Sequence, residues 1–220
     1  MHDLLDGNPV IPVITLEQVA DAVPLAEALV SGGIRVLEVT LRTDVAVEGI
    51  REIIKHVPDA IVGTGTVLNE EQVKLSEDLG CQFMISPGIT EKLLELAKKS
   101  AVPFLPGVSS VSELMLGMQY GLQNFKFFPA EVAGGVPALK AMAEPFSAVK
   151  FCPTGGIGQH NALDYLALPN VMAVVVGTIW HWQLVRLGPL ARYTAWTSPH
   201  KCLSARKQLS AASMMMQMRV

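Results

Sequence analysis

Between residues 9 and 180, short runs of β-branched and other apolar residues alternate with segments whose apolar residues recur at helical spacing. The apolar runs are too continuous for strands with one face in water and are typical of strands buried on both faces. Eight such runs predict strands at residues 10–15, 35–41, 60–65, 81–86, 103–108, 124–128, 148–153 and 172–177.

The segments between these runs carry helix boundary signals. Asn69 and Thr90 each stand directly before acids that open a helical turn, as N-cap residues do. Ser110 and Glu113 have the spacing of a capping box. The pair Gly32-Gly33 predicts the end of the first helix. Each predicted strand is therefore followed by a helix.

Strands and helices in strict alternation, with short connections, predict parallel strands joined by right-handed crossovers. Eight units of roughly 27 residues favour a single-domain α/β fold, the (β/α)8 TIM barrel, over residues 1–180. The rival architecture is an open doubly wound sheet. Its GxGxxG fingerprint is absent after the first strand, which ends in Thr15-Leu16-Glu17-Gln18. A dinucleotide site is not expected.

Composition narrows the class of protein. A chain with 50% hydrophobic and 17% charged residues buries a substantial core, and a net charge of -3 gives no basic field for nucleic acid. The N-terminus lacks the basic and apolar regions of an export signal, and the most apolar stretch, residues 171–177, is too short to span a membrane. Cys81, Cys152 and Cys202 form no CxxC pair. We therefore expect a cytoplasmic protein with no membrane or nucleic-acid partner.

Residues 181–220 differ in charge from the rest. The last acid is Asp164, so residues 1–180 have a net charge of -9 and residues 181–220 of +6. We expect a divergent basic tail, helical in part from a cap at Ser198, whose bases form a solvated face more readily than a site for anionic lipid or nucleic acid. A shifted reading frame is one hypothesis for its origin. Resequencing the source DNA and finding the frame intact, with close relatives sharing the tail, would remove that hypothesis.

Function in such a barrel lies where the strands end, at their C-terminal ends. Lys126 stands in the sixth predicted strand between Phe125 and Phe127, and strand alternation places it on the opposite face, inside the barrel. Removal from water favours its neutral amine, which can attack a carbonyl to form a Schiff base. The alternatives are an ion pair with Glu38 or a side chain that reaches solvent.

Glu38 and Arg42 follow the same reasoning in the second strand. Glu38 can point inward, and Arg42 follows the strand end. An imine-forming lysine, a carboxyl that moves protons and a guanidinium that holds a carboxylate form a set suited to carbon–carbon chemistry on a keto acid. A structural ion pair between Glu38 and Arg42 is the alternative, and it would not exclude catalysis.

A glycine-rich loop follows the seventh strand. Successive N–H groups of Thr154-Gly155-Gly156-Ile157-Gly158 can turn toward an anion, and loops after the last two barrel strands often bind phosphate. Thr178 would add a hydroxyl. The five histidines form no cluster with acids at strand ends, so no metal site is expected.

These residues stand within motifs that resemble the 2-keto-3-deoxy-6-phosphogluconate (KDPG) and 4-hydroxy-2-oxoglutarate aldolases over residues 9–180. The motifs are Glu38-Val39-Thr40-Leu41-Arg42-Thr43, Gly63-Thr64-Gly65-Thr66-Val67-Leu68, Ser86-Pro87-Gly88, Pro106-Gly107-Val108, Lys126-Phe127-Phe128-Pro129-Ala130-Glu131 and Phe151-Cys152-Pro153-Thr154-Gly155-Gly156-Ile157.

The resemblance implies a metal-independent lyase with no cofactor, which cleaves KDPG to pyruvate and glyceraldehyde 3-phosphate in the Entner–Doudoroff pathway, with 4-hydroxy-2-oxoglutarate as a further substrate. It also implies a homotrimer. The implied site residues are Lys126 for the Schiff base, Glu38 as acid/base, Arg42 and Thr66 for the substrate carboxylate, Thr154 for stereoselectivity, Gly155, Gly156 and Thr178 for phosphate, and Pro87 and Phe128 as pocket lining.

Other functions stay open at this point. The family usually has Ser where this chain has Thr178, and the tail beyond it departs from the family pattern. An aldolase that prefers unphosphorylated 4-hydroxy-2-oxoglutarate would need Lys126 and Glu38 but not the glycine loop. A catalytically impaired barrel that only binds sugar phosphates, or a module that interacts through its basic tail, are the non-enzymatic alternatives.

Overall fold

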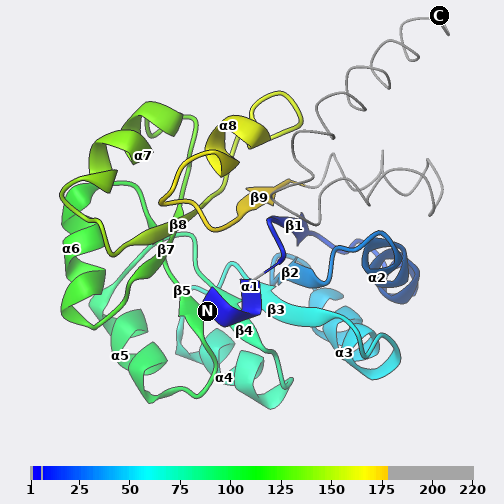
Figure 1. The fold of residues 1–220 in the computed structure, drawn as a ribbon. Coiled ribbons are helices and arrows are strands. Elements are labelled where there is room, and N and C mark those ends of the chain that lie inside the picture. Colours follow the sequence, from blue (N-terminus) through cyan, green and yellow to red (C-terminus); the bar gives the residue numbers. More distant parts are fainter. Residues whose placement is uncertain (1, 6, 178–220) are drawn as a thin grey trace, which may run out of the picture.

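The computed structural model describes residues 2–5 and 7–177, and it forms the expected (β/α)8 barrel (Figure 1). All strand pairs are parallel. The strands are β1 (Val10–Ile14), β2 (Val36–Thr40), β3 (Ile61–Gly65), β4 (Phe83–Ile85), β5 (Phe104–Leu105), β6 (Gly107–Val108), β7 (Asn124–Phe127), β8 (Lys150–Pro153) and β9 (Val174–Val176).

Helices surround the ring of strands in Figure 1. A short 3-10 turn, η1 (Val19–Asp21), follows β1 and directly precedes the helix at Ala22–Ser31. The α-helices are α1 (His2–Leu5), α2 (Ala22–Ser31), α3 (Ala46–His56), α4 (Glu70–Asp78), α5 (Glu91–Lys99), α6 (Val111–Gln119), α7 (Gly135–Ala143) and α8 (Ala162–Leu166).

Regular strand pairing is interrupted at two places around the barrel, so the ring consists of two sheets. One sheet runs in the order β5-β4-β3-β2-β1-β9, and the other in the order β6-β7-β8. The predicted strand at residues 103–108 divides into β5 and β6 at Pro106, which has no N–H to donate. Isolated parallel bridges, Phe151 to Val171 and Thr154 to Val175, join β8 to the last strand. The result is the eight-stranded ring that the hydrophobic pattern predicts.

The predicted helix starts are confirmed. The side chains of Asn69 and Thr90 accept hydrogen bonds from backbone N–H groups of α4 and α5. Ser110 and Glu113 form a complete capping box at α6. Gly33, with φ of 89°, follows α2 in the left-handed region that a residue without Cβ adopts readily. Side-chain caps thus mark the starts of α4, α5 and α6.

Two apolar layers make up the core. Outward-facing residues such as Leu37, Phe125 and Phe151 pack against the helices, and inward-facing residues such as Phe83 and Val175 fill the barrel. Leu5 of α1, which the sequence pattern did not predict, belongs to the inner group. It packs with residues near the starts of the strands, so α1 covers the N-terminal end of the barrel. The C-terminal end is left for the site.

No helix in residues 2–5 and 7–177 is long and apolar enough to cross a membrane. The basic tail at residues 181–220 and Thr178 lie outside the described residues.

Candidate active site

Lys126 and Glu38 form an ion pair inside the barrel. The Nζ atom of Lys126 on β7 lies 3.2 Å from Oε1 of Glu38 on β2. Lys126 is 5% exposed and Glu38 is 1% exposed, so water screens neither charge well. At this depth the attraction between the two charges offsets part of the cost of removing each of them from water. The pair expected as one alternative from sequence is present, and it joins the two candidate catalytic groups.

Strand register explains why Lys126 points inward. It is aligned with Gly107 of β6 and Cys152 of β8. Its neighbour Phe125 packs against α6, where a Cβ on Gly117 would come within 2.3 Å of the Phe125 ring. Because successive strand residues alternate in facing, Lys126 lies on the barrel side, as predicted.

Space for the Glu38 carboxylate comes from β3. A Cβ on Gly65 would lie 2.5 Å from Oε1 of Glu38, so any larger residue there would displace the carboxylate. The other oxygen, Oε2, is buried without a hydrogen-bond partner in the described part of the chain. A buried, unsatisfied carboxylate oxygen is costly, and it is free to interact with a substrate or water.

An aromatic ring and a buried thiol lie beside the pair. The Phe128 ring centroid lies 5.6 Å from Nζ of Lys126, within cation–π distance. Burial raises the pKa of the neighbouring Cys152 thiol to about 12; the Lys126 charge opposes this shift and the Glu38 charge adds to it. Cys152 is therefore a neutral wall of the site and not a nucleophile.

Arg42 and Thr66 meet at the strand ends beside this interior. Nε of Arg42 donates a hydrogen bond of 3.2 Å to Oγ1 of Thr66. Thr66 has φ of 64°, the one positive value for a non-glycine in residues 2–5 and 7–177. Such strain often marks a functional position. The Glu38–Arg42 ion pair considered from the sequence does not form, because Glu38 pairs with Lys126.

The glycine loop, residues 154–158, follows β8 at the same end of the barrel. Thr154 is buried, and its Oγ1 donates to the carbonyl of Cys152 at 3.3 Å. Gly155 and Gly156 have φ of 101° and 75°, values that turn the backbone sharply and that L side chains rarely adopt. The expected companion hydroxyl of Thr178 lies outside the described residues.

The two residues expected to line the pocket, Pro87 and Phe128, follow β4 and β7, between which β5 and β6 lie. Pro87 follows β4, and its backbone lies so close to β6 that a Cβ on Gly107 would be 2.2 Å from its carbonyl oxygen. Phe128 directly follows β7 and is partly buried. Among the described residues, no three His, Cys, Asp or Glu side chains gather as metal ligands.

Three residues around the glycine loop were missed as functional candidates. Glu131 stood in a quoted motif without a role, and Asn161 and Tyr165 were not considered. Asn161 occupies the N-cap position of α8, and an Asn between a glycine-rich turn and a helix is a recognisable signal for side-chain-to-backbone bonding. No local signal identifies the hydrogen bond from Tyr165 to Glu131, 34 residues apart.

Comparison with known proteins identifies the family. A family model for KDPG and KHG aldolase matches residues 1–195. The KHG/KDPG aldolase of Escherichia coli (strain K12) is 59% identical over 173 residues, 79% of this chain and 81% of that protein. The 2-dehydro-3-deoxy-phosphogluconate aldolase of Treponema pallidum (strain Nichols) is 43% identical over 195 residues, 89% of this chain and 93% of that protein.

A solved structure extends the likeness to three dimensions. The KDPG aldolase of Legionella pneumophila, with pyruvate captured at low pH as a covalent carbinolamine intermediate, has a TM-score of 0.79 at 48% identity. The match covers 84% of this chain and 93% of that one. With a buried lysine–glutamate pair inside a (β/α)8 barrel and these similarities over most of its length, the chain belongs to the KDPG and KHG aldolase family.

Proposed function

We propose that this aldolase cleaves 2-keto-3-deoxy-6-phosphogluconate to pyruvate and glyceraldehyde 3-phosphate through a Schiff base on Lys126, and that it also cleaves 4-hydroxy-2-oxoglutarate to pyruvate and glyoxylate. The observation that carries the proposal is the buried contact of 3.2 Å between Nζ of Lys126 and Oε1 of Glu38. An amine this close to a carboxylate can pass its proton to it, which supports Lys126 as the nucleophile and Glu38 as the acid/base group.

Bond formation begins with that proton. Transfer from Lys126 to Glu38 leaves a neutral amine, whose nitrogen attacks the C2 keto carbon of the substrate. The carbinolamine so formed loses its oxygen as water when the Glu38 carboxyl returns the proton. The product is an iminium ion, and Glu38 is again a carboxylate.

Cleavage uses the same two groups. The Glu38 carboxylate takes the proton of the C4 hydroxyl, the C3–C4 bond breaks, and its electron pair moves to the iminium nitrogen. The aldehyde leaves, and an enamine stays on Lys126. Glu38 returns the proton to C3, and water then hydrolyses the iminium to pyruvate and free Lys126. The iminium nitrogen accepts the electrons, so the reaction needs no cofactor.

Arg42 and Thr66 would hold the substrate carboxylate. A guanidinium can present two parallel N–H groups to a carboxylate, and the hydroxyl of Thr66 already accepts from Arg42 Nε. This orients the C2 carbon toward Lys126, with Pro87 and Phe128 as the pocket wall. Thr154, buried beside the strand end, would bear on which face of the enamine the aldehyde approaches.

The glycine loop would bind the substrate phosphate. Its two positive-φ glycines have no Cβ to block the approach of an anion, and Thr178 would supply a hydroxyl.

We place the reaction in the cytoplasm and the active protein in a homotrimer. The helix α6 supports an assembly, because Val111, Met115 and Met118 share one face and are all exposed.

The test is steady-state kinetics on both substrates, measured as pyruvate formation. Lys126→Met is expected to lower kcat/KM by about 10³-fold or more on each substrate, because the covalent route is lost. Lys150→Met is the matched control, since the ammonium group of Lys150 on β8 donates a hydrogen bond to the Pro169 carbonyl, away from the site. Undiminished activity of Lys126→Met would overturn the proposal.

A further inference from the structure

The glycine loop is held by backbone hydrogen bonds from the segment that follows β7. The N–H of Ala130 donates to the carbonyl of Thr154 at 2.7 Å, and the N–H of Glu131 donates to the carbonyl of Gly155 at 3.2 Å. Two successive carbonyls of the loop therefore point away from the space in which an anion would sit.

Asn161 holds the other half of the loop. Its Nδ2 donates to the carbonyl of Gly156 at 3.1 Å, and its Oδ1 accepts from the N–H of Gly158 at 2.8 Å. One side chain thus fixes both a donor and an acceptor of the loop backbone. With the carbonyls engaged, the N–H groups of Gly155, Gly156 and Ile157 have no acceptor in the described part of the chain.

Glu131 and Tyr165 lie beneath the loop. A Cβ on Gly156 would lie 2.6 Å from Cγ of Glu131, so the loop packs directly on this side chain. The Tyr165 hydroxyl donates to Oε1 of Glu131, and the Tyr165 residue is fully buried on α8. Burial, together with the hydrogen bond to Glu131 and its charge, raises the pKa of Tyr165, so the phenol keeps the proton that it donates.

This contact has an electrostatic consequence. A carboxylate so close to a loop that binds phosphate would repel the ligand if it turned toward it. The Tyr165 hydroxyl holds the Glu131 carboxylate on the side of α8, where the hydrogen bond offsets part of its charge.

From these contacts we infer that Tyr165, Glu131 and Asn161 are positioning residues for the phosphate end of the substrate. They set the loop conformation that presents its free N–H groups, and they restrain the one carboxylate among them. The inference rests on the proposed function and goes beyond it, because it assigns discrimination between phosphorylated and unphosphorylated substrates to residues that act through the loop backbone.

The test compares KM and kcat for the two substrates in Tyr165→Phe. Loss of the hydroxyl is expected to raise KM for 2-keto-3-deoxy-6-phosphogluconate by about tenfold, with a much smaller change in kcat. KM for 4-hydroxy-2-oxoglutarate is expected to stay within about twofold, because that substrate has no phosphate. A purely structural role would affect both substrates alike.

Further variants keep the test informative if Tyr165→Phe folds poorly. Asn161→Ala acts from the more accessible side of the loop and is expected to show the same split between substrates. Glu131→Ala should also show it, whereas Glu131→Gln keeps an oxygen for Tyr165 and is expected to retain the wild-type KM for the phosphorylated substrate.

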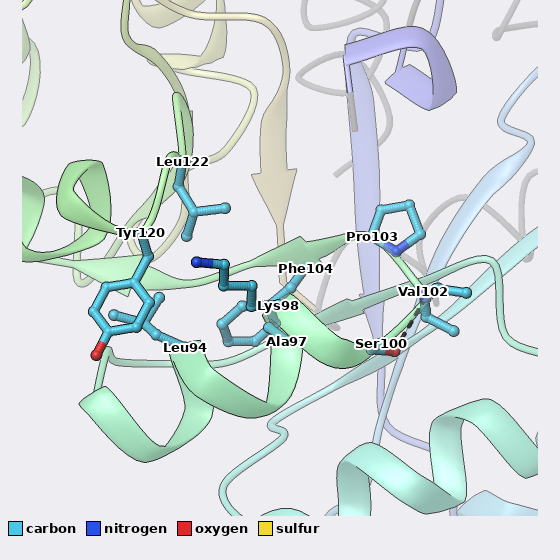
Figure 2. A pocket seen from close by; sticks show the side chains of 10 residues that line it. Leu94, Ala97, Lys98, Ser100, Val102, Pro103, Phe104, Tyr120 and Leu122 are labelled. Carbon is cyan, nitrogen blue, oxygen red and sulfur yellow. Dashed lines mark hydrogen bonds between the residues drawn. The ribbon is translucent and has the colours of Figure 1, made fainter.

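Tyr120→Phe is the matched control. Tyr120 lines a separate cavity of about 160 Å³ between α5 and the end of α6, with Lys98 and Phe104 among its other walls (Figure 2). This cavity lies where helices lead into strands, at the end of the barrel opposite the site. The substitution removes the same hydroxyl and is expected to change neither KM.

The results distinguish the positioning role of the three residues from the proposed function of the protein. If the wild-type protein turns over both substrates but Tyr165→Phe and Asn161→Ala shift both KM values equally, or neither, the positioning role is wrong and the proposed function stands. If the wild-type protein turns over neither substrate, the proposed function fails and this inference fails with it.

Discussion

Lys126 and Glu38 lie 88 residues apart in the sequence and meet in the buried interior of the barrel. Removing either charge alone leaves the other buried without a partner, which is strongly unfavourable. A neutral variant of matched shape keeps the packing but leaves the partner charge unpaired, so its folding is measured together with its activity.

Glu38→Gln keeps the shape of the side chain and removes its ability to take a proton. We expect kcat to fall by about 10²- to 10⁴-fold on both substrates, the usual contribution of a general acid–base group. Glu48→Gln is the control, because Glu48 forms an exposed ion pair with Arg51 on α3. A Glu38→Gln protein that is folded by circular dichroism and fully active would exclude Glu38 as the proton carrier.

The two buried thiols should resist modification. Burial raises the pKa of both Cys81 and Cys152 from the ordinary value of 9.0 to about 12. Since only the thiolate reacts well, iodoacetamide at pH 8.5 is expected to leave both unmodified in the folded protein and to modify both in urea. Peptide mass spectrometry distinguishes the sites. Rapid labelling of Cys152 in the folded protein would contradict the burial of this thiol beside Lys126.

Sequence patterns predict the facing of single residues well and their partners poorly. The alternation of Phe125, Lys126 and Phe127 correctly places the lysine inside. The pairing of Glu38 with Lys126 rather than Arg42 depends on strand register across the barrel, which periodicity does not specify. The contact between Tyr165 on α8 and Glu131 in the turn after β7 forms through tertiary packing and leaves no trace in local sequence.

At the scale of elements, the capping box of α6 is a discrete source of stability. Burial alone would raise the pKa of the Glu113 carboxyl, but hydrogen bonds from Ser109 and Ser110 outweigh it and lower the pKa. As the pH falls, the Glu113 carboxyl therefore binds a proton in the unfolded chain before it does so in the folded protein. The stabilisation is therefore present at neutral pH and is lost on acidification.

Ser110→Ala should destabilise the protein by about 1 kcal/mol, the usual cost of an N-cap serine. Urea unfolding followed by circular dichroism measures it at pH 7. Ser112→Ala is the control, because Ser112 is an exposed residue inside the same helix. Equal stability of Ser110→Ala and Ser112→Ala would contradict the capping role.

Local sequence predicts where the strands lie along the chain, but it predicts the residues at which they begin and end less accurately. The strands are shorter than predicted by one to three residues. Some of the residues beyond their ends, such as Ala60, Cys81 and Val149, are buried apolar residues outside the strands, which the hydrophobic pattern does not distinguish from strand residues. Pro106 divides one predicted strand in two. The four-residue helix α1 was not predicted, since so short a segment is stabilised by packing of Leu5 on the barrel interior and not by its own propensity.

At the scale of the whole molecule, eight strand–helix units correctly predict a closed barrel. Closure itself depends on long-range pairs, such as β1 with β9, and on the bridges between β8 and β9. The end of the barrel that holds the site follows from topology, because the loops after parallel strands gather there. Composition separates the tail at residues 181–220 from the body, and the tail lies outside the described residues.

The proposed homotrimer gives a definite mass. Three copies of the 23.7 kDa chain correspond to about 71 kDa, which sedimentation equilibrium measures directly. Met115→Lys places a charge on the exposed apolar face of α6 and is expected to shift the mass toward the monomer. A wild-type protein that is monomeric at micromolar concentration would contradict the assembly and leave the chemistry of the barrel unaffected.

The most direct test of the central claim is to trap the covalent intermediate. The protein is incubated with pyruvate and sodium borohydride, digested, and searched by peptide mass spectrometry for a reduced pyruvyl adduct. We expect an adduct on Lys126 that is absent from Lys126→Met and retained in Lys150→Met. A folded protein that carries no adduct, or carries it on another lysine, would contradict the assignment of Lys126 as the Schiff-base residue.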